Sequence, residues 1–143
     1  MSRRASRRPY VLDEQIGFIL CQVVQRHVAL FDRLMGGDLT PTQWAALSKL
    51  ADVGTCSQNQ LGRLTAMDVA TIKGVIDRLS ARGLTKTGAD PNDGRRLLVA
   101  LTPAGREKVD DAVSDAFQAT EDTLAPLTPA ERETLKSLLL KLR

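Results

Sequence analysis

The sequence predicts a mainly α-helical fold with one small β-hairpin. Apolar side chains recur at helical spacing through most of the 143 residues. Helix starts are marked repeatedly by a hydroxyl or carboxylate side chain placed just before an apolar periodic segment. Only residues 84–101 alternate as strands do, and they contain a Pro-Asn-Asp-Gly turn. At this length we expect a single domain over 1–143.

The chain begins with a basic segment, residues 1–10, that contains four arginines and a proline. We interpret it as an arm that either contacts a polyanion or is a terminus with no role. Apolar residues at helical spacing then predict a helix over 11–35, and the pair Gly36-Gly37 ends it.

The other helices are predicted from their starts. Thr40-Pro41-Thr42-Gln43 has the pattern of a capping box and opens a helix over 41–52. The same logic places Ser57 at the start of a helix over 57–65 and Asp68 at the start of a helix over 68–82. Two Thr-Pro pairs predict the closing helices, 103–124 and 129–142.

Between these helices the sequence predicts a hairpin, with strands at 84–88 and 96–101 and a turn at 90–95. In the second strand, Leu97, Val99 and Leu101 are expected to face inward. Two arginines near the tip are not needed for folding, and they make sense if the tip meets a polyanion. We expect Asp93 to pair with Arg95 and so to aim its guanidinium.

Two short helices followed by a basic hairpin form the layout of a winged helix-turn-helix that binds duplex DNA. The N-terminal part of the second helix would face base edges in the major groove, and the hairpin arginine would enter a minor groove. The alternative is an amphipathic core helix with an ordinary polar face. The candidate DNA contacts are Ser57, Val69, Ala70, Thr71, Lys73, Gly74, Arg78, Lys86, Asp93, Arg95 and Arg96.

The chain resembles the MarR family of bacterial transcription regulators. The resemblance is carried by Asp90-Pro91-x-Asp93-x-Arg95, by Leu101-Thr102-x-x-Gly105 and by Ile76-Asp77-Arg78-Leu79-x-x-x-Gly83-Leu84. It implies a winged-helix part over 41–101 and a homodimer built from residues 11–36 and 103–143. It also implies binding to a palindromic operator on double-stranded DNA, and repression that a small aromatic anion or an oxidant relieves.

The apolar pattern of the closing helices agrees with a dimer. They carry more apolar surface than one small winged helix needs, although the same stripes could pack within one chain. One stripe is formed by Val109, Ala112, Val113, Ala116, Phe117 and Leu124, and the other by Leu135, Leu138, Leu139 and Leu142.

For the effector, the sequence offers a single histidine, His27, and a single tryptophan, Trp44. Together they suit an aromatic carboxylate, whereas the alternative is a hydrogen-bonded core histidine and a core tryptophan. Residues 10–20 also resemble family members that regulate nicotinate or other aromatic-acid breakdown. A nicotinate- or benzoate-like effector is therefore the first expectation.

Thiol sensing through Cys21 is the rival expectation, because some family members carry a reactive cysteine in the first helix. The alternative, which the residue types favour, is that Cys21 is a small core residue, and Cys56 offers no better setting. The two cysteines lack the spacing of a metal site, and with one histidine we expect no metal, no cofactor and no enzyme activity. A further alternative is an architectural protein that binds DNA without sequence choice. The absence of an apolar leader or span predicts a cytoplasmic, nucleoid-associated protein.

Overall fold

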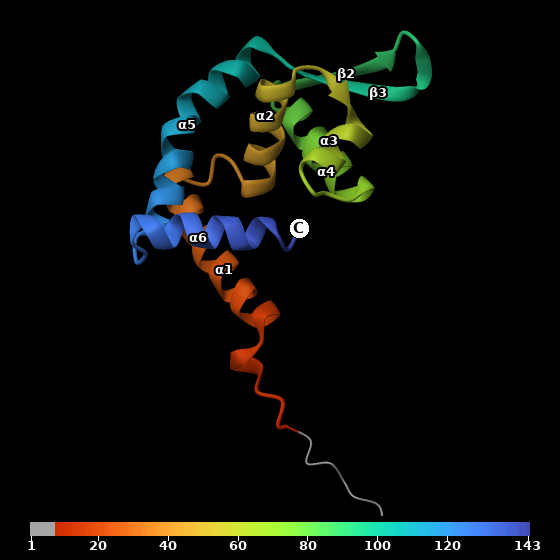
Figure 1. Ribbon diagram of the computed structural model, residues 1–143. Coiled ribbons are helices and arrows are strands. Elements are labelled where there is room, and N and C mark those ends of the chain that lie inside the picture. Colours follow the sequence, from red (N-terminus) through yellow and green to blue (C-terminus); the bar gives the residue numbers. More distant parts are fainter. Residues whose placement is uncertain (1–7) are drawn as a thin grey trace, which may run out of the picture.

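The computed structural model describes residues 8–143, and within them the predicted fold class is confirmed: helices surround one small winged sheet (Figure 1). Residues 1–7, most of the basic arm, lie outside this part of the chain. The elements are η1 (Leu12–Glu14), α1 (Ile16–Met35), α2 (Pro41–Val53), β1 (Cys56–Ser57), α3 (Gln58–Leu64), α4 (Val69–Ala81), β2 (Thr85–Asp90), β3 (Asp93–Leu101), α5 (Pro103–Leu124) and α6 (Pro129–Leu140).

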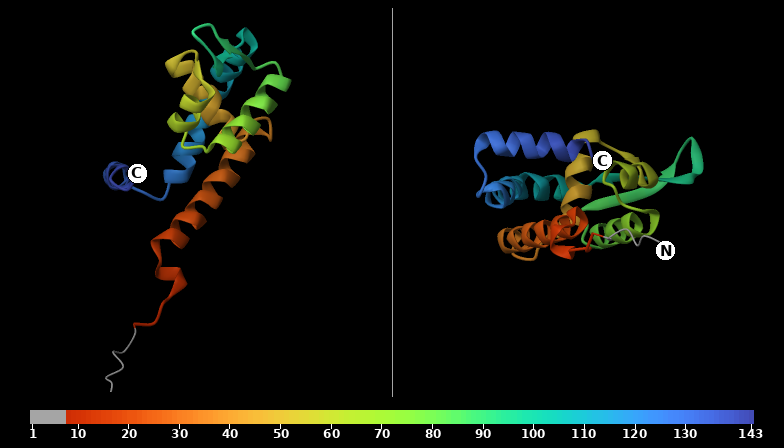
Figure 2. Two further views of the ribbon diagram at one scale, coloured as in Figure 1. Left: turned by 90° about the vertical axis from the view of Figure 1, so that its right-hand side faces the viewer. Right: turned by 60° about the horizontal axis from the view of Figure 1, so that its bottom comes forward.

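The molecule has two parts (Figures 1 and 2). One, which we call the reading head, contains α2 to α4 and the sheet, and its hairpin projects as a wing. The other is formed by α1, α5 and α6. The N-terminal half of α1 extends away from the rest, and α6 stands apart from the reading head at the far end of α5 (Figure 2). None of the described helices is long and apolar enough to span a bilayer.

The predicted helix caps explain where most helices begin. Thr40 and Thr128 each form a full capping box, with Gln43 and Glu131 respectively. Ser57 accepts a hydrogen bond from the N–H of Gln60 at 3.2 Å and so caps α3.

The first helix differs from the prediction at its start. Residues 12–14 form a 3₁₀ turn, Gln15 is extended (φ −86°, ψ 131°), and α1 begins only at Ile16. The Gln15 side chain donates to the carbonyl of Val11 at 2.8 Å, which stabilises this separate turn. Apolar periodicity continues across the break, so a pattern of spacing alone could not locate it.

The sheet has three antiparallel strands in the order β1-β3-β2, where two were predicted. The additional strand β1 is only two residues long and pairs Cys56 with Val99, so it is too short for alternation to reveal. The predicted turn at 90–95 was also too long, because β2 and β3 continue to Asp90 and Asp93 with a register shift near the tip.

Leu97 is a further correction, because 49 % of its surface is exposed although it was expected to face inward. Val99, two residues on, is fully buried. The difference arises because β1 pairs only with Leu98 and Val99, so the ribbon beyond them leaves the core and becomes the projecting wing. Most of the core lies inside the reading head, but Phe31 and Met35 of α1 and Val109, Ala112 and Ala119 of α5 are buried in the same cluster. Its largest fully buried side chains are Leu39, Leu47, Leu50, Leu61, Ile72, Ile76, Leu79, Val75 and Val99.

The start of α5 is fixed tightly to the turn between α4 and β2. The Thr102 hydroxyl donates to the carbonyl of Gly83 at 2.6 Å, and the Thr102 N–H donates to the carbonyl of Leu84 at 3.1 Å. Gly105 lies so close to the Leu84 carbonyl that any side chain there would collide with main chain. The wing and the start of α5 therefore form one rigid unit with the end of α4.

Candidate nucleic-acid interface

The N-terminal half of α4 is exposed, as the helix-turn-helix interpretation requires. Val69 is 69 % exposed, and Ala70, Thr71 and Lys73 are also exposed, while Gly74 is half-buried. The opposite face of α4 is fixed in the core by Ile72, Val75, Ile76 and Leu79.

Asp68 begins α4 by accepting a hydrogen bond from the N–H of Thr71 at 2.7 Å. This hydrogen bond holds the pKa of the Asp68 carboxyl below its usual value. The first turn of α4 is thereby fixed and presents its side chains outward.

Lys73 and Arg78 lie further along the exposed face of α4. Lys73 pairs with Asp77 at 2.8 Å, one turn along the helix, and both side chains are more than 60 % exposed. An exposed pair of this kind is worth little, so DNA can redirect the lysine at small cost. Arg78 is exposed on the following turn. Within residues 8–143 it forms no ion pair, and Asp77 is occupied by Lys73.

At the wing, the expected pairing of Asp93 with the Arg95 guanidinium is wrong. The Asp93 carboxylate instead accepts from the main-chain N–H of Arg95 at 3.1 Å, and Asp90 accepts from the N–H of Asn92 at 2.9 Å. Both acids therefore close the turn, because main-chain N–H groups at a tight tip are nearer than a long side chain. The arginine is left exposed, as is Lys86 on β2.

A polar hollow of about 460 Å³ lies between α3 and the part of β3 that follows the wing tip. We call it the arginine cleft, because Arg63, Arg95 and Arg96 all line it and no carboxylate does. Its other lining residues are Ser57, Gln58, Asn59 and Leu97.

Three of these residues, Gln58, Asn59 and Arg63, were missed at the level of sequence. A signal existed, since Asn59 and Arg63 are spaced i,i+4 and so share one face of α3. The same two residues also line a second hollow with Asp68 and Val69. Asn59 and Arg63 therefore connect the wing and the start of α4 into one surface. Ser57 lines the cleft too, but it is only 4 % exposed and its hydroxyl caps α3.

His27 and Trp44, the two candidate effector residues, lie in different settings. The half-buried His27 ring bonds through Nδ1 to the Thr123 hydroxyl at 2.7 Å and lies 6.3 Å from the Phe31 ring. Trp44 lines a hollow on α2 that includes Lys49 and Leu64. His27 therefore bonds to α5, whereas Trp44 lies against the end of α3.

The two cysteines also differ from each other. Cys21 is exposed on α1, which contradicts its interpretation as a core residue. Cys56 is buried in β1, and burial raises the pKa of its thiol. Residues 8–143 contain no group of three or more side chains suited to hold a metal ion.

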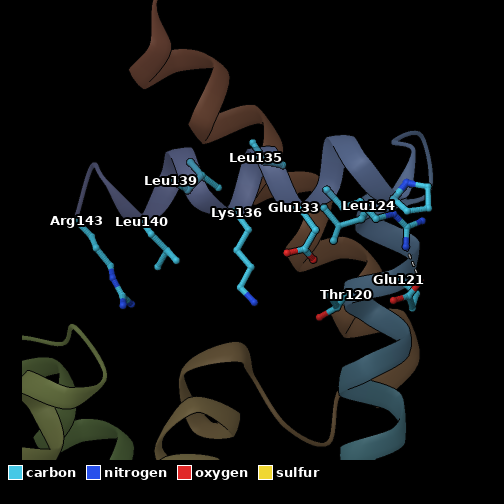
Figure 3. Close-up of a pocket in the computed structure, with 11 residues that line it drawn as sticks. Thr120, Glu121, Leu124, Glu133, Leu135, Lys136, Leu139, Leu140 and Arg143 are labelled. Carbon is cyan, nitrogen blue, oxygen red and sulfur yellow. Dashed lines mark hydrogen bonds and ion pairs between the residues drawn. The ribbon is translucent and has the colours of Figure 1, made fainter.

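Apolar side chains are exposed along all three helices outside the reading head. On α6 no residue is buried, and its exposed leucines are Leu135, Leu138, Leu139 and Leu140. A hollow of about 660 Å³ lies between α5 and α6. Lys136 and Leu140 of α6 point into it, as does Arg143 beyond the end of that helix (Figure 3). The exposed apolar residues of α1 and α5 are Ile16, Ile19, Leu20, Val23, Val24, Val113 and Phe117. We call this set with the α6 leucines the apolar face; of the predicted stripe, Val109 and Ala112 are instead buried in the chain's own core.

Comparison with known proteins agrees with this geometry. The model of the MarR family matches residues 37–96, which correspond to the reading head. The HTH-type transcriptional repressor NicR of Pseudomonas putida is 38 % identical over 135 residues, which cover 94 % of this chain and 85 % of NicR.

Two solved structures are similar over nearly their whole length. A probable transcriptional regulator from Pseudomonas aeruginosa has a TM-score of 0.90 at 57 % identity, covering 93 % of this chain and 100 % of that one. BpsR of Bordetella bronchiseptica, described with a mechanism for regulation of its DNA binding by 6-hydroxynicotinic acid, has a TM-score of 0.90 at 43 % identity and covers 94 % and 97 % of the two chains. NicR and the Pseudomonas aeruginosa protein are named as regulators of transcription, and the chain belongs to the MarR family of winged-helix transcription regulators.

Proposed function

We propose that this protein is a homodimeric repressor that binds a palindromic operator and is released by a hydroxypyridine or benzene carboxylate. One observation carries the DNA-binding part. The arginine cleft, which no carboxylate lines, is continuous through Asn59 and Arg63 with the exposed start of α4. Such a surface suits a polyanion whose backbone and base edges are contacted together.

On duplex DNA, each part of this surface has a distinct role. The first turns of α4 enter the major groove, where Thr71 and Lys73 reach polar base edges and Val69 contacts thymine methyl groups. Arg95 at the wing enters the adjacent minor groove, where A·T-rich narrowing deepens the negative potential. Arg63 and Arg96 in the cleft bind phosphates and set the register.

A second copy of the chain covers the apolar face in this proposal. A water-exposed patch that includes Phe117 at 70 % and Leu138 at 54 % exposure is unusual for a monomer. A two-fold dimer buries it and presents two α4 helices to one side of the duplex. Half-sites one helical turn apart, roughly 34–36 Å, would then be read together.

The effector class is supported by the similarity to BpsR, whose DNA binding is regulated by 6-hydroxynicotinic acid. In this chain His27 is the candidate hydrogen-bond partner, since it lies half-buried where α1 meets α5. An effector bound between α1 and α5 would change the packing of the helices that carry the reading heads. Trp44 is a separate candidate contact.

Release through oxidation of Cys21 is the second candidate, favoured by the exposure of that thiol in the single chain. Cys56 is a poor sensor because it is buried and its thiol pKa is raised.

The DNA-binding proposal is tested by selecting duplexes from a random library with the full-length protein. We expect a palindrome whose half-sites are about one helical turn apart. Equal affinity for the selected duplex and a scrambled one at fixed salt would instead indicate an architectural protein without sequence choice.

The effector is tested with nicotinate, 6-hydroxynicotinate and benzoate, and with nicotinamide as a matched control that lacks the carboxylate. The effector is expected both to raise the melting temperature and to release the selected duplex. Release by hydrogen peroxide that a Cys21→Ser variant resists, with no release by any acid, would favour the thiol route.

A further inference from the structure

Asp38 lies in the short segment that joins α1 to the reading head, and both of its carboxylate oxygens are bound. Arg82 donates to Oδ1 at 2.7 Å and also donates to the Asp38 main-chain carbonyl at 2.7 Å. Lys108 donates to Oδ2 at 2.8 Å. We call these three residues the Asp38 clasp. It joins three places that are distant in sequence: the α1–α2 connection, the C-cap of α4 and the second turn of α5.

The conformation of the α1–α2 connection places this carboxylate beside Arg82 and Lys108. Gly36 and Gly37 have φ values of 59° and 75°, a left-handed conformation that other residues adopt at a cost. The Asp38 N–H donates to the carbonyl of Met35 at 3.0 Å, which closes the turn. The neighbouring Lys108 and Arg82 cations also hold the pKa of the Asp38 carboxyl below its usual value, so it stays charged.

The position of the clasp matters more than its strength. Exposed ion pairs contribute little to stability, and the Asp38 side chain is 47 % exposed. The end of α4, the wing and the start of α5 already form one rigid unit through Thr102 and Gly105. The end of α1 already packs against the core through Phe31 and Met35, and Asp38 adds polar bonds from the connection that follows it. The chain passes between the two parts of the molecule at residues 36–40 and again at Thr102, where α5 begins. The clasp links the first of these crossings to the second turn of α5.

We infer that Asp38 is a positioning residue that sets the angle of the reading head against the dimer helices, and so the separation of the two α4 helices. This inference rests on the proposed dimeric, DNA-binding function. Two rigid reading heads fit only one distance between half-sites. The clasp therefore determines how strongly the dimer discriminates between operators of different half-site spacing.

The geometry is tested without DNA by measuring the distance between the two wings of the dimer. Lys86 is replaced by Cys in a Cys21→Ser background and labelled with a nitroxide, while the buried Cys56 stays unlabelled. Asp38→Asn is expected to broaden the distribution of distances between the two nitroxides, measured by pulsed electron paramagnetic resonance. The matched control is Asp52→Asn, which removes an equal charge from an exposed pair within α2, where Lys49 lies 3.7 Å away. A distribution in Asp38→Asn as narrow as in Asp52→Asn overturns the inference.

The functional consequence is tested on the selected operator and on versions with two base pairs inserted at its centre. Asp38→Asn should bind the original spacing roughly 2- to 30-fold more weakly, and should lose less affinity on insertion than the wild type does. Its salt dependence should be unchanged, because Asp38 makes no phosphate contact. An equal loss at every spacing would overturn the inference. If the wild type selects no palindrome, the proposed function fails, while the wing distances still decide the role of the clasp.

Discussion

The role of the arginine cleft leads to a quantitative prediction for Arg63→Ala. Arg63 lines the cleft together with Arg95 and Arg96, and a dimer presents two such clefts. If each Arg63 neutralises one phosphate, the variant dimer loses two phosphate contacts. The slope of log affinity against log salt then becomes shallower by about 1.8, at about 0.9 per contact on B-form DNA. When salt is raised from about 50 to 200 mM, both proteins lose operator affinity. The fold-loss of the wild type should be about 12 times the fold-loss of the variant.

The assay is fluorescence anisotropy of the labelled operator at four or more salt concentrations. Arg33→Ala is the matched control, since Arg33 is an exposed arginine in the last turn of α1 and lies outside the reading head. It should keep the wild-type slope. The preference for operator over scrambled DNA should persist in Arg63→Ala, because phosphates carry no sequence information. A wild-type slope in Arg63→Ala would show that the cleft does not hold the DNA backbone.

Three further predictions concern the helices and the clasp. Thr71→Ala should reduce the preference for operator over random DNA by about 1–3 kcal/mol at an unchanged salt slope, measured by competition binding; an unchanged preference would exclude Thr71 from base recognition. Leu138→Glu should convert the dimer to monomers in sedimentation velocity. Leu138 is 54 % exposed in the single chain, and the partner would bury the charge introduced at this position. A dimer that persists would place the interface elsewhere. The pKa of the Asp38 carboxyl lies below its usual value of 3.8, so the contribution of Asp38 to folding is complete above that pH and is lost as the pH falls through the lower, folded-state pKa. Asp38→Asn should therefore show a shallower fall of melting temperature in acid, and an unaltered acid profile would contradict this.

Much of the fold could be predicted because helix starts depend on residues that are close together in the sequence. Thr40, Asp68, Thr102 and Thr128 each cap a helix through their own side chain, and such caps identify helix starts to within a residue. The exposed start of α4 followed from the helical spacing of its apolar residues, Ile72, Val75, Ile76 and Leu79, which leaves most of the first turn outside the core.

What the sequence could not predict depends on tertiary geometry. The Asp93 carboxylate could bind either a guanidinium or a main-chain N–H, and only the conformation of the tip decides between them. The arginine cleft arises because α3 and β3 meet in space, so Arg63 gains its neighbours from residues more than thirty positions away. The exposure of Leu97 likewise depends on where β1 stops pairing.

The most direct test of DNA recognition by this winged helix is the operator affinity of Arg95→Ala at fixed salt. Removal of a guanidinium that occupies the minor groove should weaken binding by about 1–3 kcal/mol, or about 5- to 150-fold. An Arg95→Ala variant that binds the operator as tightly as the wild type would contradict a DNA-reading role for the wing.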